Sequence, residues 1–155
     1  MRKGFTLIEI LVSITLMAIL VGVYFLVGNP AGQLAASRNS QRTLNLQTIM
    51  NDVYLYIDDQ PSEQFASCAA GSLPIGTSSA KFMASASTSA NYNIGPCLAA
   101  VNIHSLPFDP SASSSYFNSM TDYNTGFKIS VNASGTVITL SAPYAELNKT
   151  ISISR

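Results

Sequence analysis

One apolar run near the N-terminus constrains this chain more than any other feature of its sequence. The run extends from Phe5 to Val27, which is 23 residues, and Glu9 is its one charged residue. A helix of that length crosses the roughly 30 Å hydrocarbon core of a bilayer. A secretory signal peptide fits less well, because its apolar region has about 7–15 residues followed by a small-residue cleavage site. We therefore expect residues 5–28 to form a transmembrane helix.

The charges near this run predict its orientation and single out Glu9. Arg2 and Lys3 precede the run, so the first residues should stay in the cytoplasm and the remainder should be exported. An acidic side chain inside a membrane span is costly and is by default a functional candidate. From position alone, a hydrated carboxylate at the lipid headgroups explains Glu9 equally well.

The residues around Glu9 carry a family resemblance. The segment that starts the run closely resembles the processing site of type IV pilins, type II secretion pseudopilins and competence pilins: Lys3-Gly4-Phe5-Thr6-Leu7-Ile8-Glu9. The resemblance implies that residues 1–4 are a leader peptide, which a prepilin peptidase removes by cutting between Gly4 and Phe5. It also implies that Phe5 is then N-methylated.

The resemblance also implies a function and a location. It implies a structural subunit of a type IV pilus-like filament used for adhesion, twitching motility or uptake, and not an enzyme. The chain would be a single-pass cytoplasmic membrane protein before assembly and part of an extracellular filament afterwards. Its partners would be other pilin subunits, the pilus assembly platform and its ATPase. A minor pilin, a type II secretion pseudopilin and a DNA-binding competence pilin remain alternatives.

Glu9 acquires a role if the leader is removed. Cleavage would take away Arg2 and Lys3, change the formal side-chain balance from zero to −2, and create an ammonium group on Phe5. An unpaired charge that leaves water costs several kcal/mol. We therefore expect Glu9 to pair with the Phe5 ammonium of an adjacent subunit or of its own chain, and to set subunit register during filament assembly.

Residues 29–60 predict a second, amphipathic stretch of helix. Apolar residues recur there at three- and four-residue spacing, while polar residues, Arg42 among them, are assigned to the other faces. The apolar positions are Leu46, Ile49, Met50, Val53, Tyr54 and Ile57. At Pro30, a kink or melted stretch and a loop between two helices are equally expected.

Residues 61–125 are rich in Ser and Ala and predict a loop region with short elements. Cys68 and Cys97 lie within it, and an even pair of cysteines in an exported protein reads as a disulfide, with two separate thiols as the alternative. The segment from Leu106 to Pro110, Leu-Pro-Phe-Asp-Pro, is also similar to pseudopilins and small pilins.

Residues 126–155 predict antiparallel strands. Apolar and polar residues alternate on both sides of Ala133-Ser134-Gly135, a three-residue turn with Gly135 in the left-handed region. The expected fold is α+β and pilin-like: a long N-terminal helix, with its apolar half in the membrane or filament core, packed on a small C-terminal antiparallel sheet of three to four strands.

Few residues of the sequence indicate nucleic-acid binding, metal binding or glycosylation. With 8 basic and 8 acidic residues the chain has no net charge and no basic stripe, so nucleic acid is an unlikely partner. His104 is the single histidine. We expect no cofactor, although Asp109 and Asp122 could offer carboxylates to calcium, as comparable loops of some pseudopilins do. Asn132 and Asn148 each start an Asn-x-Ser/Thr pattern, whose use for glycosylation depends on the organism.

Overall fold

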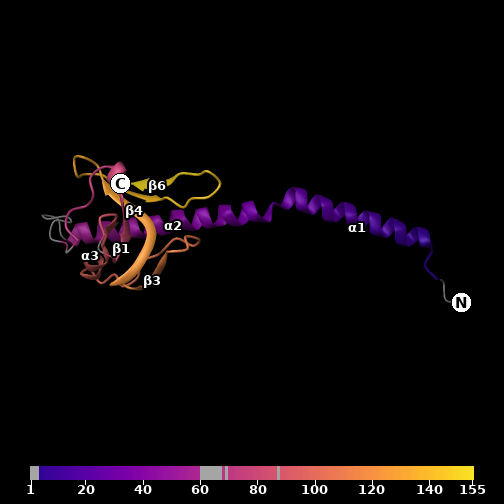
Figure 1. Cartoon of the computed structure of the whole chain (residues 1–155), viewed down its shortest axis with the longest axis horizontal. Coiled ribbons are helices and arrows are strands. Elements are labelled where there is room, and N and C mark those ends of the chain that lie inside the picture. The colour runs from indigo at the N-terminus through magenta and orange to yellow at the C-terminus, as the bar shows by residue number, and fades with distance from the viewer. Residues whose placement is uncertain (1–3, 60–67, 69, 87) are drawn as a thin grey trace. The chain divides into compact units, whose positions relative to one another are not determined.

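The computed structural model describes residues 4–59, 68, 70–86 and 88–155 (Figure 1). The leader residues Met1, Arg2 and Lys3 lie outside the described residues. The chain forms two compact units, Met1–Leu34 and Ala35–Arg155. The predicted α+β class, with a long helical segment followed by a small sheet, is confirmed.

Helix α1 (Leu7–Gly28) contains most of the apolar run. Its 22 residues span about 33 Å at 1.5 Å per residue, enough to cross a bilayer core. The hydroxyls inside it bond back to helix carbonyls: Ser13 Oγ donates to Glu9 O at 2.7 Å, and Thr15 Oγ1 donates to Val12 O at 2.9 Å. These polar side chains therefore need no partner outside the helix.

The helix is interrupted at a single residue, Asn29, which has φ 23° and ψ 62°. Helix α2 (Pro30–Asp59) begins immediately afterwards, where the proline's missing N–H costs nothing. Asn29 Oδ1 accepts a bond from the Gly32 amide at 3.1 Å, and Gln33 Nε2 donates to Gly28 O at 2.6 Å. Side chains thus satisfy backbone groups on both sides of the break. The expected interruption at Pro30 is a one-residue junction.

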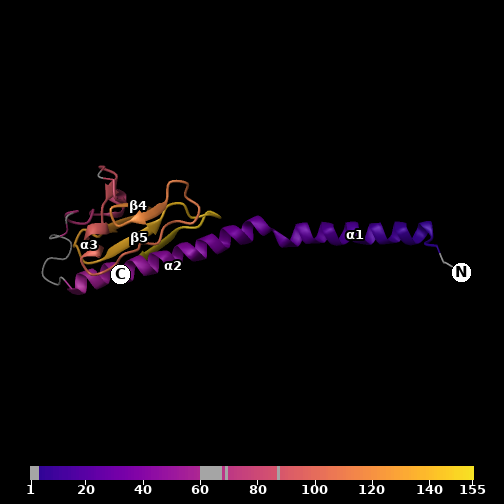
Figure 2. The same cartoon turned by 90° about the horizontal axis from the view of Figure 1, so that it is seen from below.

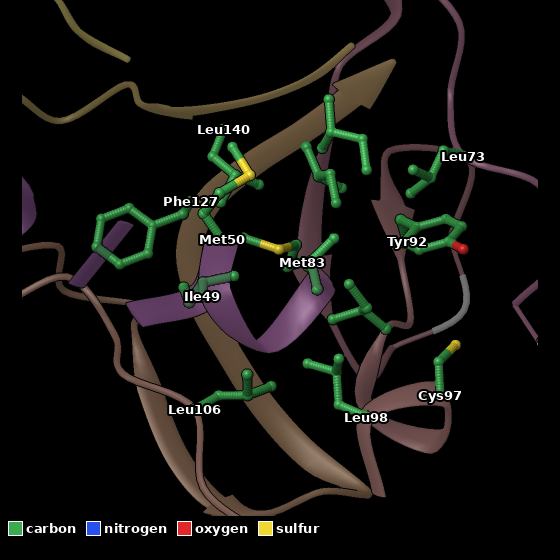
Figure 3. Close-up of a cluster of buried hydrophobic side chains, with 14 of the residues drawn as sticks. Ile49, Met50, Leu73, Met83, Tyr92, Cys97, Leu98, Leu106, Phe127 and Leu140 are labelled. Carbon is green, nitrogen blue, oxygen red and sulfur yellow. The ribbon is translucent and has the colours of Figure 1, made fainter. Parts of the chain in front are cut away.

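The part of α2 from Ala35 onwards packs on the sheet (Figure 2). Leu46, Ile49, Met50 and Val53 are buried, as their spacing predicted, and Tyr56 joins them. Figure 3 shows Ile49 and Met50 among side chains of the strands, and Leu98 of the short helix α3 (Gly95–Ala99) belongs to the same cluster. This helix–sheet contact forms the hydrophobic core of the C-terminal unit.

In the part of the chain that the structure describes, the sheet has six strands. They are β1 (Lys81–Ala84), β2 (Asn91–Tyr92), β3 (Tyr116–Ser119), β4 (Asp122–Val131), β5 (Ile138–Ala142) and β6 (Ile151–Ser154). The order is β2-β1-β4-β5-β6, with β3 also paired to β4. β1 and β2 are parallel, and the other pairs are antiparallel. The predicted turn is present, with Gly135 at φ 73° between β4 and β5.

The sheet is larger than the three to four antiparallel strands that we expected. β1, β2 and β3 lie inside the region 61–125 assigned to loops and short elements, and β4 starts at Asp122, before residue 126. β1, β2 and β3 are short: β1 and β3 pair with β4, and β2 pairs with β1, so their own sequences carry little periodic signal.

The long strand β4 curves through the sheet (Figure 1). Gly126 lies at φ 74° within it, and the register between β1 and β4 shifts between Phe82 and Ala84. A Cβ at Gly126 would lie 3.1 Å from Asp109 Cβ and overlap Ser115 Oγ. Glycine therefore permits both the bulge and the close approach of the segment that begins at Asp109.

The predicted disulfide is confirmed: Cys68 and Cys97 are bonded, with their Cα atoms 5.3 Å apart. Both cysteines lie in the core, and Figure 3 shows Cys97 beside Leu98 of α3. In the chain-entropy model, closing a loop of about 30 residues stabilises the fold by roughly 3.5 kcal/mol.

Arg42 is not on a solvent-facing side of the helix, as its polarity suggested, but is completely buried. Its Nε and Nη2 atoms donate to both carboxylate oxygens of Asp109, at 2.8 and 3.1 Å. Nη1 donates to Glu146 Oε2 at 3.0 Å and to Asn39 Oδ1 at 2.8 Å. Burial is tolerated because two carboxylates pair with the guanidinium.

Glu146 fastens the loop between β5 and β6 to α2. Arg38 contacts its two carboxylate oxygens through Nε and Nη2, at 2.8 and 2.7 Å. Asn39 bonds the Glu146 backbone at both its carbonyl and its amide. We call Arg38, Asn39, Arg42, Asp109 and Glu146 the arginine cluster; it joins α2 to two segments distant in sequence.

Replacing Arg42 should destabilise the C-terminal unit strongly. Arg42→Met leaves the buried Asp109 carboxylate without its countercharge, which typically costs about 3–5 kcal/mol. The matched control is Arg38→Met, which removes a partly exposed ion pair and should therefore cost far less. Urea unfolding of the full chain in mild detergent measures both. Equal losses in the two variants would contradict the proposed importance of the buried pair.

The arginine cluster should also make stability depend on acid. Hydrogen bonds from Arg38 and Arg42 lower the pKa of Glu146 from 4.5 to about 2. Because the folded pKa is the lower one, this stabilisation is complete above about pH 4.5 and is lost as pH falls towards 2. Glu146→Gln should reduce the dependence of the unfolding free energy on pH across that window. An unchanged dependence would show that Glu146 is not the group responsible.

Candidate functional site

The junction between Gly4 and Phe5 lies just before α1, where the chain forms neither helix nor strand. Both residues are exposed, and the Phe5 side chain is 84% exposed. The first helical residue is Leu7, so the peptide bond between Gly4 and Phe5 is outside the helical hydrogen-bond ladder. A peptidase can therefore bind this bond in extended form without unwinding α1.

Thr6 and Glu9 together form the N-terminal cap of α1. The Thr6 backbone amide and hydroxyl both donate to Glu9 Oε2, at 2.9 and 2.8 Å, and the Glu9 amide donates to Thr6 Oγ1 at 3.3 Å. This reciprocal arrangement is a capping box. Glu9 was singled out from the sequence but the capping role of Thr6 was not, although Thr-x-x-Glu before an apolar run is the signal for such a box.

The capping box fixes the position of the Glu9 carboxylate. The carboxylate folds back towards the start of the helix and contacts the amide of the residue that follows Phe5. It also adds negative charge at the helix N-terminus, where the helix dipole favours it. The structure thus brings Glu9 close in sequence and space to the chain end that cleavage after Gly4 would create.

The surface of α1 is almost uniformly apolar. Every residue from Leu7 to Val27 is exposed within this chain. Length and composition make this helix suitable for crossing a membrane, with a mean hydropathy of 2.7 over its most apolar window. Apolar surface of this extent needs lipid or another apolar chain to cover it.

The two calcium candidates have other partners. Both oxygens of Asp109 bind Arg42, and one also accepts the amides of Ser111 and Ala112. Asp122 accepts bonds from Tyr116 and Asn118 at the turn between β3 and β4, and those bonds lower the pKa of Asp122. Calcium at Asp109 would have to displace the Arg42 guanidinium. Among the described residues, no group of three or more His, Cys, Asp or Glu could hold a metal ion.

His104 is exposed beside a groove between α2 and the segment that leads to Phe108. Asp52 and Phe117 line the same groove.

Four basic residues follow α2 in the sequence, and two of them lie over aromatic rings of this chain. Lys128 Nζ is 4.7 Å from the centre of the Phe82 ring, and the Arg155 guanidinium is 4.6 Å from that of Tyr54. These contacts engage positive charge that nucleic-acid binding would otherwise use.

Comparison with known proteins identifies a family motif at the N-terminus of the chain. Residues 1–25 match the family model for the prokaryotic N-terminal methylation motif. Searches of curated proteins and of solved structures found no match to the chain. The motif implies processing by prepilin peptidase and use of pilus assembly machinery, and together with α1 it fits membrane anchoring before assembly. The family that carries it is structural and not enzymatic.

The resemblance noted at residues 3–9 is therefore confirmed, and the first 25 residues carry the methylation motif that supports a type IV pilin or pseudopilin.

Proposed function

We propose that this chain is the structural subunit of a type IV pilus-like filament, assembled through α1 after cleavage between Gly4 and Phe5. The observation that carries the proposal is a methylation motif over residues 1–25 that includes most of a 22-residue helix with an apolar exterior. Lipid covers this exterior before assembly. Copies of the same helix replace the lipid in the filament, while the C-terminal unit faces outwards.

Glu9 supplies the carboxylate that pairs with an ammonium group in this assembly. In the uncut chain its carboxylate is satisfied by Thr6. Once Phe5 becomes the N-terminus, an ammonium group stands one residue before the amide that Glu9 already accepts. When helices bundle, that ammonium on a neighbouring subunit offers Glu9 a full countercharge in place of a neutral donor, and a charge-assisted bond is the stronger one.

A minor pilin or a secretion pseudopilin would use the same motif and helix. These possibilities differ in the expected abundance of the protein, because a major pilin dominates purified surface fibres and the other two are scarce. DNA capture is less well supported, since Lys128 and Arg155 lie over aromatic rings of the chain itself. The described C-terminal unit therefore offers little unengaged positive charge for phosphates.

Removing the Glu9 charge should block assembly but not processing. Glu9→Val should still yield chains that start at Phe5, because the cleavage site is intact. Fibre yield should fall at least tenfold, since an unpaired ammonium in an apolar bundle costs several kcal/mol and each 1.4 kcal/mol is a factor of ten. Peptide mass spectrometry of membranes and immunoblots of sheared fibres measure the two effects separately.

Two companion variants separate charge from helix capping. Glu9→Gln keeps a hydrogen-bond acceptor for Thr6 but removes the charge, so it should fail like Glu9→Val. Ser13→Ala removes a hydroxyl that bonds only within α1 and should assemble normally. Normal fibre yields from both Glu9 variants would refute the pairing role.

A further inference from the structure

The two Asn-x-Ser/Thr patterns of the chain lie in different surroundings. Asn132 is half-buried at the start of the turn between β4 and β5. Its Oδ1 accepts the amides of Thr136 and Val137, at 2.8 and 3.1 Å, and its Nδ2 donates to Thr136 Oγ1 at 3.1 Å. The side-chain amide is therefore part of the turn, and modifying its nitrogen would disturb the cap.

Asn148 presents the opposite case. It is exposed, together with Leu147, Lys149 and Thr150, in the loop between β5 and β6. Within the described chain, its side-chain amide forms no hydrogen bond. Its backbone has φ 53°, a left-handed conformation that asparagine tolerates better than most residues. Asn148 and Thr150, two residues later, are both exposed to solvent.

The base of this loop is held firmly while its tip is exposed. Glu146, two residues before Asn148, is fixed to α2 by the arginine cluster. The Lys149 amide donates to Glu146 O at 3.2 Å and closes the turn around Asn148. A bulky group on Asn148 can therefore be accommodated without breaking a contact of the fold.

We propose that Asn148 is an N-glycosylation site of the exported chain and that Asn132 is not. The glycan donor would be a polyprenyl-diphosphate-linked sugar used by a membrane-bound oligosaccharyltransferase. A bond forms between Asn148 Nδ2 and the anomeric carbon of the sugar, and the bond from that carbon to the diphosphate oxygen breaks. The amide loses one proton, and the lipid diphosphate leaves with its oxygen. This proposal requires export of the C-terminal unit but not filament assembly.

The modification has a physical consequence for the surface of the loop. Leu147 is 51% exposed beside the site, and Tyr144, in the same loop, is 44% exposed. A glycan on Asn148 is bulky and well hydrated, so it would shield these apolar side chains from other molecules.

Glycopeptide mass spectrometry of the native chain tests the proposal, in both the membrane and the surface-fibre fractions. Trypsin leaves both asparagines on one peptide, residues 129–149, because Lys128 and Lys149 flank them. Fragmentation that preserves the glycan should place the added mass on Asn148. Testing the membrane fraction separates failure of glycosylation from failure of assembly.

Four variants make the assignment specific. Asn148→Gln and Thr150→Ala should lose the added mass, whereas Thr150→Ser should retain it because serine preserves the pattern. Ser134→Ala removes the other pattern and should also retain the mass; it deletes the hydrogen bond between the Ser134 and Thr136 hydroxyls but leaves the bonds that Asn132 makes with Thr136 and Val137. An unmodified Asn148 in the native chain, or a mass that persists in Asn148→Gln, would overturn the proposal.

Discussion

The uncovered apolar surface of α1 is the constraint on which the rest of this molecule depends. Water is a poor solvent for such a surface, so the helix needs lipid or other apolar chains around it. Its backbone bonds are satisfied internally, which allows it to cross a bilayer as a single helix. Exchange of lipid for copies of itself would leave Glu9 as the most costly group to bury. Leader removal would create an ammonium group close to that carboxylate, and the capping box fixes the position of the carboxylate.

The C-terminal unit is held together by a disulfide and a few ion pairs, because its sequence offers few large apolar side chains. A tenth of the residues are charged, and much of the middle of the chain is Ser and Ala. The Cys68–Cys97 disulfide joins the core to α3, and the arginine cluster joins α2 to the segments at Asp109 and Glu146. These contacts connect residues far apart in the chain, so they hold a small sheet packed on one helix.

Local signals explain what could be predicted from sequence. The apolar face of α2 follows helical spacing, and the turn at Gly135 follows from the need for a left-handed residue. The capping partner Thr6 was also within reach, because its spacing to Glu9 is a local pattern. The burial of Arg42 could not be predicted, because it depends on Asp109, 67 residues away in the chain, and on Glu146, which is farther still. Strands as short as β1 and β2 were missed because β1 is stabilised by pairing with the distant β4, and the two-residue β2 by pairing with β1.

The most direct test of the central claim is the mass of the N-terminal peptide in protein sheared from the cell surface. A filament subunit should start at Phe5, carry one added methyl group and be found in the fibre fraction. That result would establish processing and polymerisation in one sample, and the abundance of the chain would separate a major pilin from a scarce one. A chain that begins at Met1 and occurs solely in membranes would contradict the account and indicate a protein that is anchored but never assembled.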